Sequence, residues 1–182
     1  MKWRTLVVIG AAAVSLSGSE VSGQKPTPPP DKWAALRFVL GTWEGTSTGR
    51  PGEGTVRRQY QLVLQDQFIE IRNTSTYPAQ PKNPKGEVHH DLGYFSYDRM
   101  RKRLILRQFH VEGFVNQYVQ DLVPPAGALA FTSEAIENIP FGWRARETYI
   151  VHGPDEFEEV FELAESGKPF ELYSRTRLKR VP

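Results

Sequence analysis

The stretch Leu36-Arg37-Phe38-Val39-Leu40-Gly41-Thr42-Trp43-Glu44-Gly45 contains the change of pattern that decides the fold of this chain. Trp33, Leu36 and Leu40 follow the i, i+3, i+7 spacing of one apolar helix face. We therefore expect a short helix over residues 31–39, capped by an aspartate and ended by a glycine. From residue 42 onward the pattern changes to the two-residue alternation that is typical of β-strands.

Downstream of this stretch, short alternating segments are separated by turn residues, and no second helix is indicated. We expect ten strands: Thr42–Thr48, Gly54–Leu64, Phe68–Thr76, Asp91–Tyr97, Arg103–Val111, Phe114–Leu122, Ala128–Glu134, Trp143–Val151, Glu156–Leu163 and Phe170–Arg180. Such a series predicts an all-β, antiparallel up-and-down meander. A meander that does not close leaves two exposed edges, so we expect a ten-stranded barrel, with a two-sheet sandwich as the alternative.

Upstream, the first 23 residues have the three parts of a secretory signal peptide. Lys2 and Arg4 form a positive region, residues 6–16 are apolar, and small residues precede a cleavage position before Gln24. A proline-rich spacer over residues 24–31 follows, and residues 32–182 then form a single barrel domain. We therefore expect a periplasmic or secreted protein, with no integral membrane segment once the signal is removed.

Composition excludes several classes of function. Removing the signal takes away Lys2, Arg4 and Glu20, so the net charge falls from +2 to +1 over 159 of the 182 residues. A nearly neutral domain with interspersed charges is a poor binder of nucleic acid. The chain has no cysteine, which excludes a disulfide scaffold, a thiolate metal site and a cysteine nucleophile.

The last hairpin gives a first register. Centring it on the Ser166-Gly167 turn places Glu158 opposite Arg175 and Glu156 opposite Arg177. The inner face of this hairpin would hold Phe157, Phe161, Leu163, Phe170 and Leu172. The alternating Arg175, Arg177 and Lys179, and the acidic run Asp155-Glu156-Phe157-Glu158-Glu159, are both interpreted as charged outer faces.

A second hairpin, centred on Glu112-Gly113, has a more aromatic face that we expect to point inward. That face consists of Ile105, Arg107, Phe109, Val111, Phe114, Asn116 and Tyr118. A slip of one residue would reverse the assignment and turn His110 inward instead.

Two further strands place polar side chains on apolar faces. Arg58 and Tyr60 share the face of Val56 and Leu62, and Glu147 shares that of Trp143. The ligand-binding set predicted from these patterns is Arg58, Tyr60, Arg107, Phe109, Asn116, Tyr118, Trp143 and Glu147. Buried charges need a partner or a ligand, so an internal Arg58–Glu147 or Arg107–Glu147 salt bridge is the structural alternative to a binding site.

The opening stretch, with its short helix leading into Gly-x-Trp, resembles the entry of calycin barrels such as lipocalins and fatty-acid-binding proteins. Leu40-Gly41-Thr42-Trp43-Glu44-Gly45 and the segment Gly86–Tyr94 are most similar to the nitrobindin-like haem-binding β-barrel family. The resemblance implies haem held by a histidine of the last strand, but residues 173–180 contain none. The remaining candidates for an axial ligand are His110, His89 and His90, and less directly His152, Met100 and the tyrosines.

Three functions follow from these observations. The first is a non-enzymatic barrel that binds a partly apolar, anionic small molecule, oriented by Arg58 and Arg107. The second, implied by the resemblance, is a haem protein that acts on nitric oxide or peroxynitrite. The third is a cofactor-free enzyme in which Glu147 acts as the acid or base and Tyr118 or Tyr60 as its proton partner. No resident cofactor is predicted with the first or third.

Overall fold

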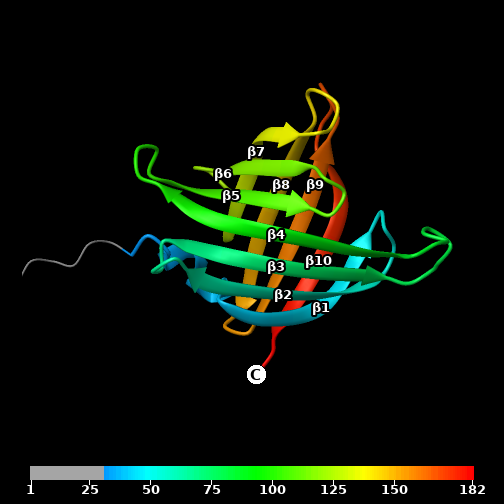
Figure 1. Ribbon diagram of the computed structural model, residues 1–182, viewed down its shortest axis with the longest axis horizontal. Helices are drawn as coiled ribbons and strands as arrows, with labels where there is room; N and C mark the ends of the chain where they lie inside the picture. The colour runs from blue at the N-terminus through cyan, green and yellow to red at the C-terminus, as the bar shows by residue number, and fades with distance from the viewer. Residues whose placement is uncertain (1–30) are drawn as a thin grey trace, which may run out of the picture. The chain divides into compact units, whose positions relative to one another are not determined.

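The computed structural model describes residues 31–182, and Figure 1 shows how successive strands lie side by side around the molecule. The expected signal peptide and nearly all of the proline-rich spacer lie outside the described residues. A short helix, η1 (Ala34–Val39), precedes ten strands: β1 (Gly41–Gly49), β2 (Gly54–Val63), β3 (Phe68–Tyr77), β4 (Glu87–Asp98), β5 (Arg103–His110), β6 (Val115–Gln120), β7 (Ala128–Glu137), β8 (Arg144–Gly153), β9 (Glu156–Ala164) and β10 (Glu171–Arg180).

The strands form a closed antiparallel barrel in which each strand pairs with its neighbours in sequence and β1 pairs with β10. The predicted ten-stranded up-and-down barrel is confirmed, and the two-sheet sandwich is excluded. Closure removes the exposed edges that an open meander of this length would leave. Within residues 31–182, no helix is long and apolar enough to cross a membrane.

The expected helix is present as a 3₁₀ helix, and it covers one end of the barrel. Asp31 accepts a hydrogen bond from the backbone N–H of Trp33 at 3.0 Å in the turn before the helix. It does not occupy the cap position expected for it, because η1 begins at Ala34 and Trp33 is its N-cap residue. The indole N–H of Trp43 in β1 donates to the carbonyl of Val39 at 2.6 Å, which ties the helix to the first strand. Arg180 at the end of β10 lies over the Trp43 ring at 4.2 Å and closes this end from the other side.

The hydrophobic core fills the half of the barrel next to η1. Its aromatic members pack edge to face, with the Trp43 and Phe157 ring centroids 4.6 Å apart. The core also includes Trp33, Leu36, Val39, Val56, Tyr60, Ile69, Ile71, Phe95, Leu104, Leu106, Tyr118, Phe131, Ala145, Tyr149 and Leu178.

The predicted register of the last hairpin was wrong by two residues over most of its length. A bulge between Leu172 and Ser174 shifts the pairing, so that Arg177 lies opposite Glu158. Leu172 is consequently exposed instead of buried. The oppositely charged residues still meet, but diagonally: Arg175 donates to Glu158, and Arg177 donates to Glu156 at 2.6 Å.

The predicted register of the β5–β6 hairpin was wrong by one residue, and this shift reverses which face of β5 points inward. The loop has three residues, Val111 to Gly113, because the N–H of His110 donates to the carbonyl of Phe114 and Gly113 adopts φ +88°. Phe109 therefore pairs with Val115, and Arg107 with Gln117. The inward face of β5 consists of Leu104, Leu106, Gln108 and His110.

Strand β4 begins four residues earlier than expected, at Glu87. His89 and His90, which precede the expected strand, therefore lie on a strand and point to opposite sides of the barrel wall. This earlier start brings His89 beside the end of β5 at the open end of the barrel.

Candidate functional site

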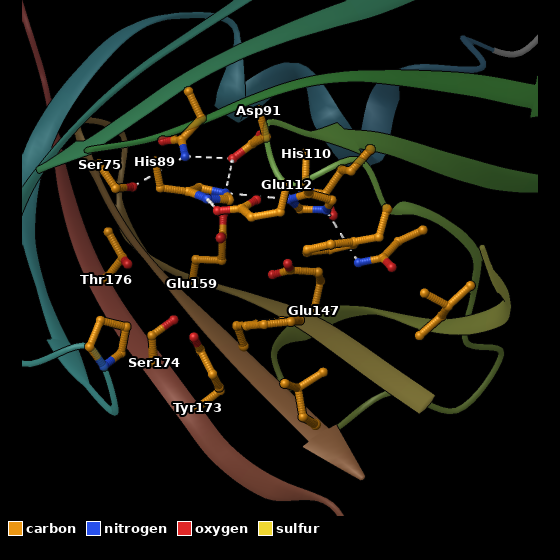
Figure 2. A pocket seen from close by; sticks show the side chains of 18 of the residues that line it. Ser75, His89, Asp91, His110, Glu112, Glu147, Glu159, Tyr173, Ser174 and Thr176 are labelled. Atoms are coloured by element: carbon orange, nitrogen blue, oxygen red, sulfur yellow. Dashed lines mark hydrogen bonds and ion pairs between the residues drawn. The ribbon is translucent and has the colours of Figure 1, made fainter. Parts of the chain in front are cut away.

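A cavity of about 390 Å³ occupies the half of the barrel farthest from η1 (Figure 2). It is open at the end formed by the β1–β2, β3–β4, β5–β6, β7–β8 and β9–β10 loops. Its lining consists of Pro51, Arg58, Asn73, Ser75, Tyr77, Glu87, His89, Asp91, Gln108, His110, Glu112, Phe114, Asn116, Ile136, Ile139, Pro140, Trp143, Glu147, Glu159, Phe161, Leu163, Tyr173, Ser174 and Thr176. The volume lies in the range of small-molecule sites.

The two sides of this cavity differ in chemistry. The segments from β6 to β9 contribute mainly apolar surface near the mouth, including Phe114, Trp143 and Phe161. The strands from β2 to β5 contribute mainly amide, carboxyl and imidazole groups. A ligand that fits both sides has an apolar part and a polar part.

A buried ion pair lies at the bottom of the cavity. Arg58 of β2 donates to the carboxylate of Glu159 of β9, and the two side chains are only 9% and 4% exposed. Arg58 also donates to Asn73 Oδ1 at 3.1 Å. Burial by itself disfavours the charged guanidinium, but Glu159, together with Tyr60, Asp91 and Tyr149, more than offsets this effect and raises the pKa of Arg58. The partner expected for Arg58 was Glu147, and the structure corrects this to Glu159.

Glu147 of β8 lies beside this pair, also with its carboxyl group directed into the cavity (Figure 2). Burial and the neighbouring Glu159 raise the pKa of Glu147 well above its ordinary value. Only the protonated form of Glu147 can donate a hydrogen bond to Glu159. In that form Glu147 is neutral, and the guanidinium of Arg58 remains paired with Glu159.

Three hydrogen-bond acceptors of the lining have no partner among the described residues: Gln108 Oε1, Asn116 Oδ1 and Glu147 Oε2. Each belongs to a side chain that is at most 4% exposed. A buried acceptor without a donor destabilises a protein by about 1–3 kcal/mol, so such atoms mark a place where donors enter from outside.

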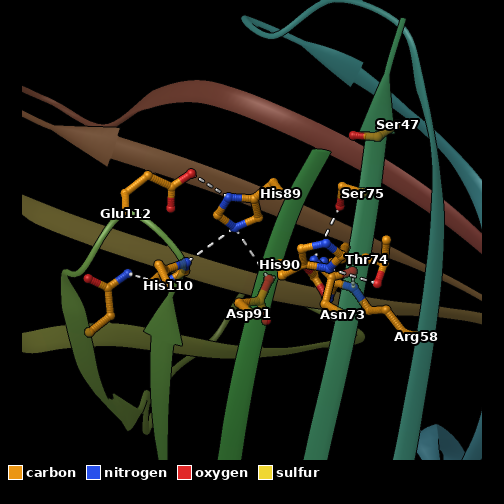
Figure 3. A network of polar contacts seen from close by, with 12 residues as sticks. Ser47, Arg58, Asn73, Thr74, Ser75, His89, His90, Asp91, His110 and Glu112 are labelled. Carbon is orange, nitrogen blue, oxygen red and sulfur yellow. Dashed lines mark hydrogen bonds and ion pairs between the residues drawn. The ribbon is translucent and has the colours of Figure 1, made fainter. Parts of the chain in front are cut away.

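Two histidines and two carboxylates form a cluster at the mouth of the cavity (Figure 3). His89 Nδ1 lies 2.8 Å from Glu112 Oε1, and its Nε2 lies 3.3 Å from His110 Nδ1 and 3.5 Å from Asp91 Oδ2. The hydrogen bond to Asp91 raises the pKa of His89 to about 9, whereas burial lowers the pKa of His110 to about 4. At neutral pH this cluster holds one charged and one neutral imidazole.

The predicted ligand-binding residues fall into three groups. Arg58, Asn116, Trp143 and Glu147 line the cavity, as expected. Tyr60 and Tyr118 point inward but belong to the packed core below the cavity, so neither reaches its surface. As a proton partner for a substrate, Tyr118 is therefore poorly placed.

The predicted inward placement of Arg107 and Phe109 was wrong, because the reversed face of β5 puts both side chains on the outside of the barrel. Arg107 donates to Gln117 Oε1 at 2.9 Å and to Ser96 Oγ at 3.3 Å, and Phe109 is 45% exposed. An Arg107–Glu147 salt bridge is thereby excluded.

Sequence reasoning missed Asp91, Gln108 and Glu159 as lining residues. Glu159 was assigned to an outer face with the rest of the acidic run, although it has the same parity as the buried Phe157. Asp91 likewise shares its parity with the buried Phe95 of β4. Strict alternation within each strand would have identified both, whereas Gln108 required the correct loop length.

Comparison with known proteins adds the family. The family model described as "THAP4-like, heme-binding beta-barrel domain" matches residues 32–180. This chain belongs to that family. The match confirms the nitrobindin-like resemblance of the Gly-Thr-Trp stretch.

Two solved barrel structures are similar to this chain. The crystal structure of Rv2717c from M. tuberculosis has the same fold; it is 17% identical with a TM-score of 0.62, and the match covers 84% of this chain and 99% of that one. A de novo designed fluorescence-activating β-barrel is 16% identical with a TM-score of 0.44, covering 81% of this chain and 97% of the designed one. A search of curated proteins found no match.

The residues of the cavity do not fit haem held from the last strand. Ser174 and Thr176 are the inward hydroxyl side chains of β10, and neither binds haem iron. Tyr173 also lines the cavity, but burial raises the pKa of its phenol and disfavours the phenolate that iron would need. An apolar porphyrin would in addition cover Gln108 and Glu147 without supplying donors to them.

Proposed function

We propose that this barrel binds a partly apolar small molecule whose N–H or O–H groups donate hydrogen bonds to the bottom of the cavity. The observation that carries the proposal is the pair of unpartnered, buried acceptors Gln108 Oε1 and Glu147 Oε2, with the amide group of Asn116 beside them. A ligand that supplies donors removes the free-energy penalty that these atoms impose on the empty barrel. Its apolar part would lie along Phe114, Trp143 and Phe161.

This proposal changes the expected charge of the ligand. The anionic ligand inferred from the sequence depended on two free guanidinium groups in the cavity. Arg107 lies outside, and Arg58 is already paired with Glu159. Arg58 and His89 face four carboxylates of the lining, on Glu87, Asp91, Glu112 and Glu159, so a neutral or cationic donor group suits the cavity better than a carboxylate.

Native mass spectrometry of the full chain, purified without denaturation, tests the proposal. We expect a bound mass on the wild-type protein and its loss in Gln108→Leu, which removes one acceptor at similar volume. Gln59→Leu is the matched control, because Gln59 lies on β2 and is exposed. A bound mass that both variants retain equally, or a wild-type protein without any bound mass, would contradict the proposal.

Haem titration distinguishes this proposed function from haem binding. Because β10 lacks an iron ligand, we expect no shifted Soret band with stoichiometric haem. A Soret band that disappears in His110→Ala would instead support haem binding through the neutral imidazole of β5.

We also propose that the protein acts outside the cytoplasm, on the basis of the signal-like pattern of its first 23 residues. Intact-mass measurement of the exported protein is expected to show a chain that begins at Gln24. Retention of the full-length chain in the cytoplasmic fraction would contradict this.

A further inference from the structure

We propose that His89, His110 and Glu112 bind a divalent transition-metal ion of the zinc type at the mouth of the cavity. This site lies away from the last strand, from which haem was expected to be held, and does not depend on the organic ligand proposed above. It draws on β4, the end of β5 and the loop between β5 and β6.

The first argument is geometric. Each of the three side chains offers one ligand atom, and these atoms all lie within 4.8 Å of one another. Imidazole nitrogens and a carboxylate oxygen are the usual protein ligands of Zn²⁺. Figure 3 shows His89 directed toward both His110 and Glu112, whereas the adjacent His90 lies toward Thr74.

The second argument concerns the groups behind the ligands. Asp91 Oδ2 lies 3.5 Å from His89 Nε2, and Asp91 itself accepts a hydrogen bond from Asn73 Nδ2 at 2.6 Å. A carboxylate that accepts from one imidazole nitrogen leaves the other free to bind metal, which is the common arrangement around zinc histidines. Here the free nitrogen is His89 Nδ1, which lies 2.8 Å from Glu112 Oε1. His110 Nδ1 lies 3.3 Å from the other nitrogen, His89 Nε2, so binding requires the His110 side chain to turn toward the Nδ1 side.

Independent support comes from Asn116 on β6. Its side-chain amide lies 3.3 Å from His110 Nε2, and its oxygen has no partner among the described residues although Asn116 is only 2% exposed. Rotating the amide by 180° would let this oxygen accept from His110 Nε2–H. His110 Nδ1 would then be available to the metal, and the amide nitrogen would take the place of the unpartnered oxygen, facing away from His110 as a donor.

Charge favours a cation at this point. Asp91 and Glu112 both face the two imidazoles, and a divalent ion balances two carboxylates while both imidazoles remain neutral. The metal has three protein ligands, which leaves at least one coordination position for water or for a molecule in the cavity.

Titration of the full chain with Co²⁺ or Zn²⁺ alone, after treatment with a chelator, tests this site. We expect one equivalent of Co²⁺ to give a visible absorption band, and Zn²⁺ to displace it. His89→Gln, His110→Gln and Glu112→Gln should each weaken Zn²⁺ binding at least about 10-fold, and Asp91→Asn about 10-fold through its hold on His89.

Two other histidines provide matched controls. His90→Gln alters the neighbouring, outward residue, and His152→Gln alters a histidine that lies 3.5 Å from Glu158 on the outer wall. Both should bind Zn²⁺ as the wild type does. Because Glu112 is on an exposed loop, its variant tests the site even if a histidine variant fails to fold.

Two results would overturn the site: no Co²⁺ band and no heat of Zn²⁺ binding, or binding that survives all three ligand variants. Since the titration uses no organic molecule, either failure leaves the proposed ligand binding untouched. Conversely, loss of the bound mass in Gln108→Leu says nothing about the metal.

Discussion

The two halves of the barrel interior are built from the same ten strands but differ in what fills them. Next to η1, Trp43, Phe157 and Leu106 are fully buried in a continuous apolar core. At the open end, the same strands present Arg58, Glu147 and other polar groups to a cavity. Along β2, a distance of two residues separates the core residue Tyr60 from the cavity residue Arg58.

This difference separates stability from binding. The filled half supplies close packing and edge-to-face aromatic contacts, which stabilise the fold. The open half holds unpartnered acceptors and a buried charge pair, which do not stabilise an empty barrel. Groups that weaken a fold and converge on one cavity are best explained by a ligand.

The largest expected effect is at a tryptophan of the filled half, and a tryptophan of the open half provides the comparison. Trp43→Ala should lower the free energy of unfolding by about 3–5 kcal/mol, because it leaves a cavity among fully buried side chains. Trp143→Ala should lower it by about 1 kcal/mol or less, because Trp143 already borders open space. Urea unfolding followed by circular dichroism measures both, and equal losses would show that the two halves are packed alike.

Next in size is the ion pair at the bottom of the cavity. Arg58→Met should destabilise the fold by about 3 kcal/mol, since it leaves Glu159 buried without a cation. The double variant Arg58→Met/Glu159→Leu should recover most of this loss. Arg57→Met is the control: its exposed pair with Glu44 is worth about 1 kcal/mol at most. A double variant as unstable as Arg58→Met would mean that the pair is not the cause.

A smaller effect, with a pH signature, is expected at Glu147. The unfolded chain releases this proton near the ordinary pKa of 4.5, whereas burial and Glu159 keep it on the folded protein to higher pH. The stability contributed by this group therefore falls as pH rises above about 4.5, until its folded-state pKa is passed. Glu147→Gln, which cannot ionise, should raise the unfolding free energy at pH 8 by about 1 kcal/mol or more.

Thermal unfolding should be measured from about pH 5 to about pH 9. Over this range the midpoint temperature of Glu147→Gln should change less with pH than that of the wild type. Glu165→Gln is the control, because Glu165 lies exposed in the β9–β10 turn and should leave the profile unchanged. A wild-type profile that rises across this range, with no difference in Glu147→Gln, would place an ionised carboxylate at this position.

The sequence was sufficient for the strands and the closed barrel, because two-residue alternation and turn residues are local signals. Registers were not recoverable in the same way. The three-residue loop at Gly113 and the bulge after Leu172 each change the pairing without altering the apolar pattern. In the β5–β6 hairpin, one additional loop residue was enough to exchange Arg107 for His110 in the interior.

The candidate site was also predicted only where the signal was local to one strand. Arg58 and Glu147 were found because each lies among apolar residues of one parity on its own strand. The His89, His110 and Glu112 cluster was not found as a unit, because it joins two strands and a loop whose relative register was wrong. Contacts within a strand could be predicted, and contacts across strands needed the structure.

The smallest expected effect is at Arg107, which tests the boundary between inside and outside. Its contacts, with Gln117 and Ser96, lie on the outer wall, so Arg107→Ala should change the free energy of unfolding by no more than about 0.5 kcal/mol. The bound mass in native mass spectrometry should also be unchanged. Gln108→Leu, one residue away and facing inward, should remove it. If Arg107→Ala abolished the bound mass while Gln108→Leu retained it, the face of β5 would be reversed and the ligand would be anionic, as first inferred from the sequence.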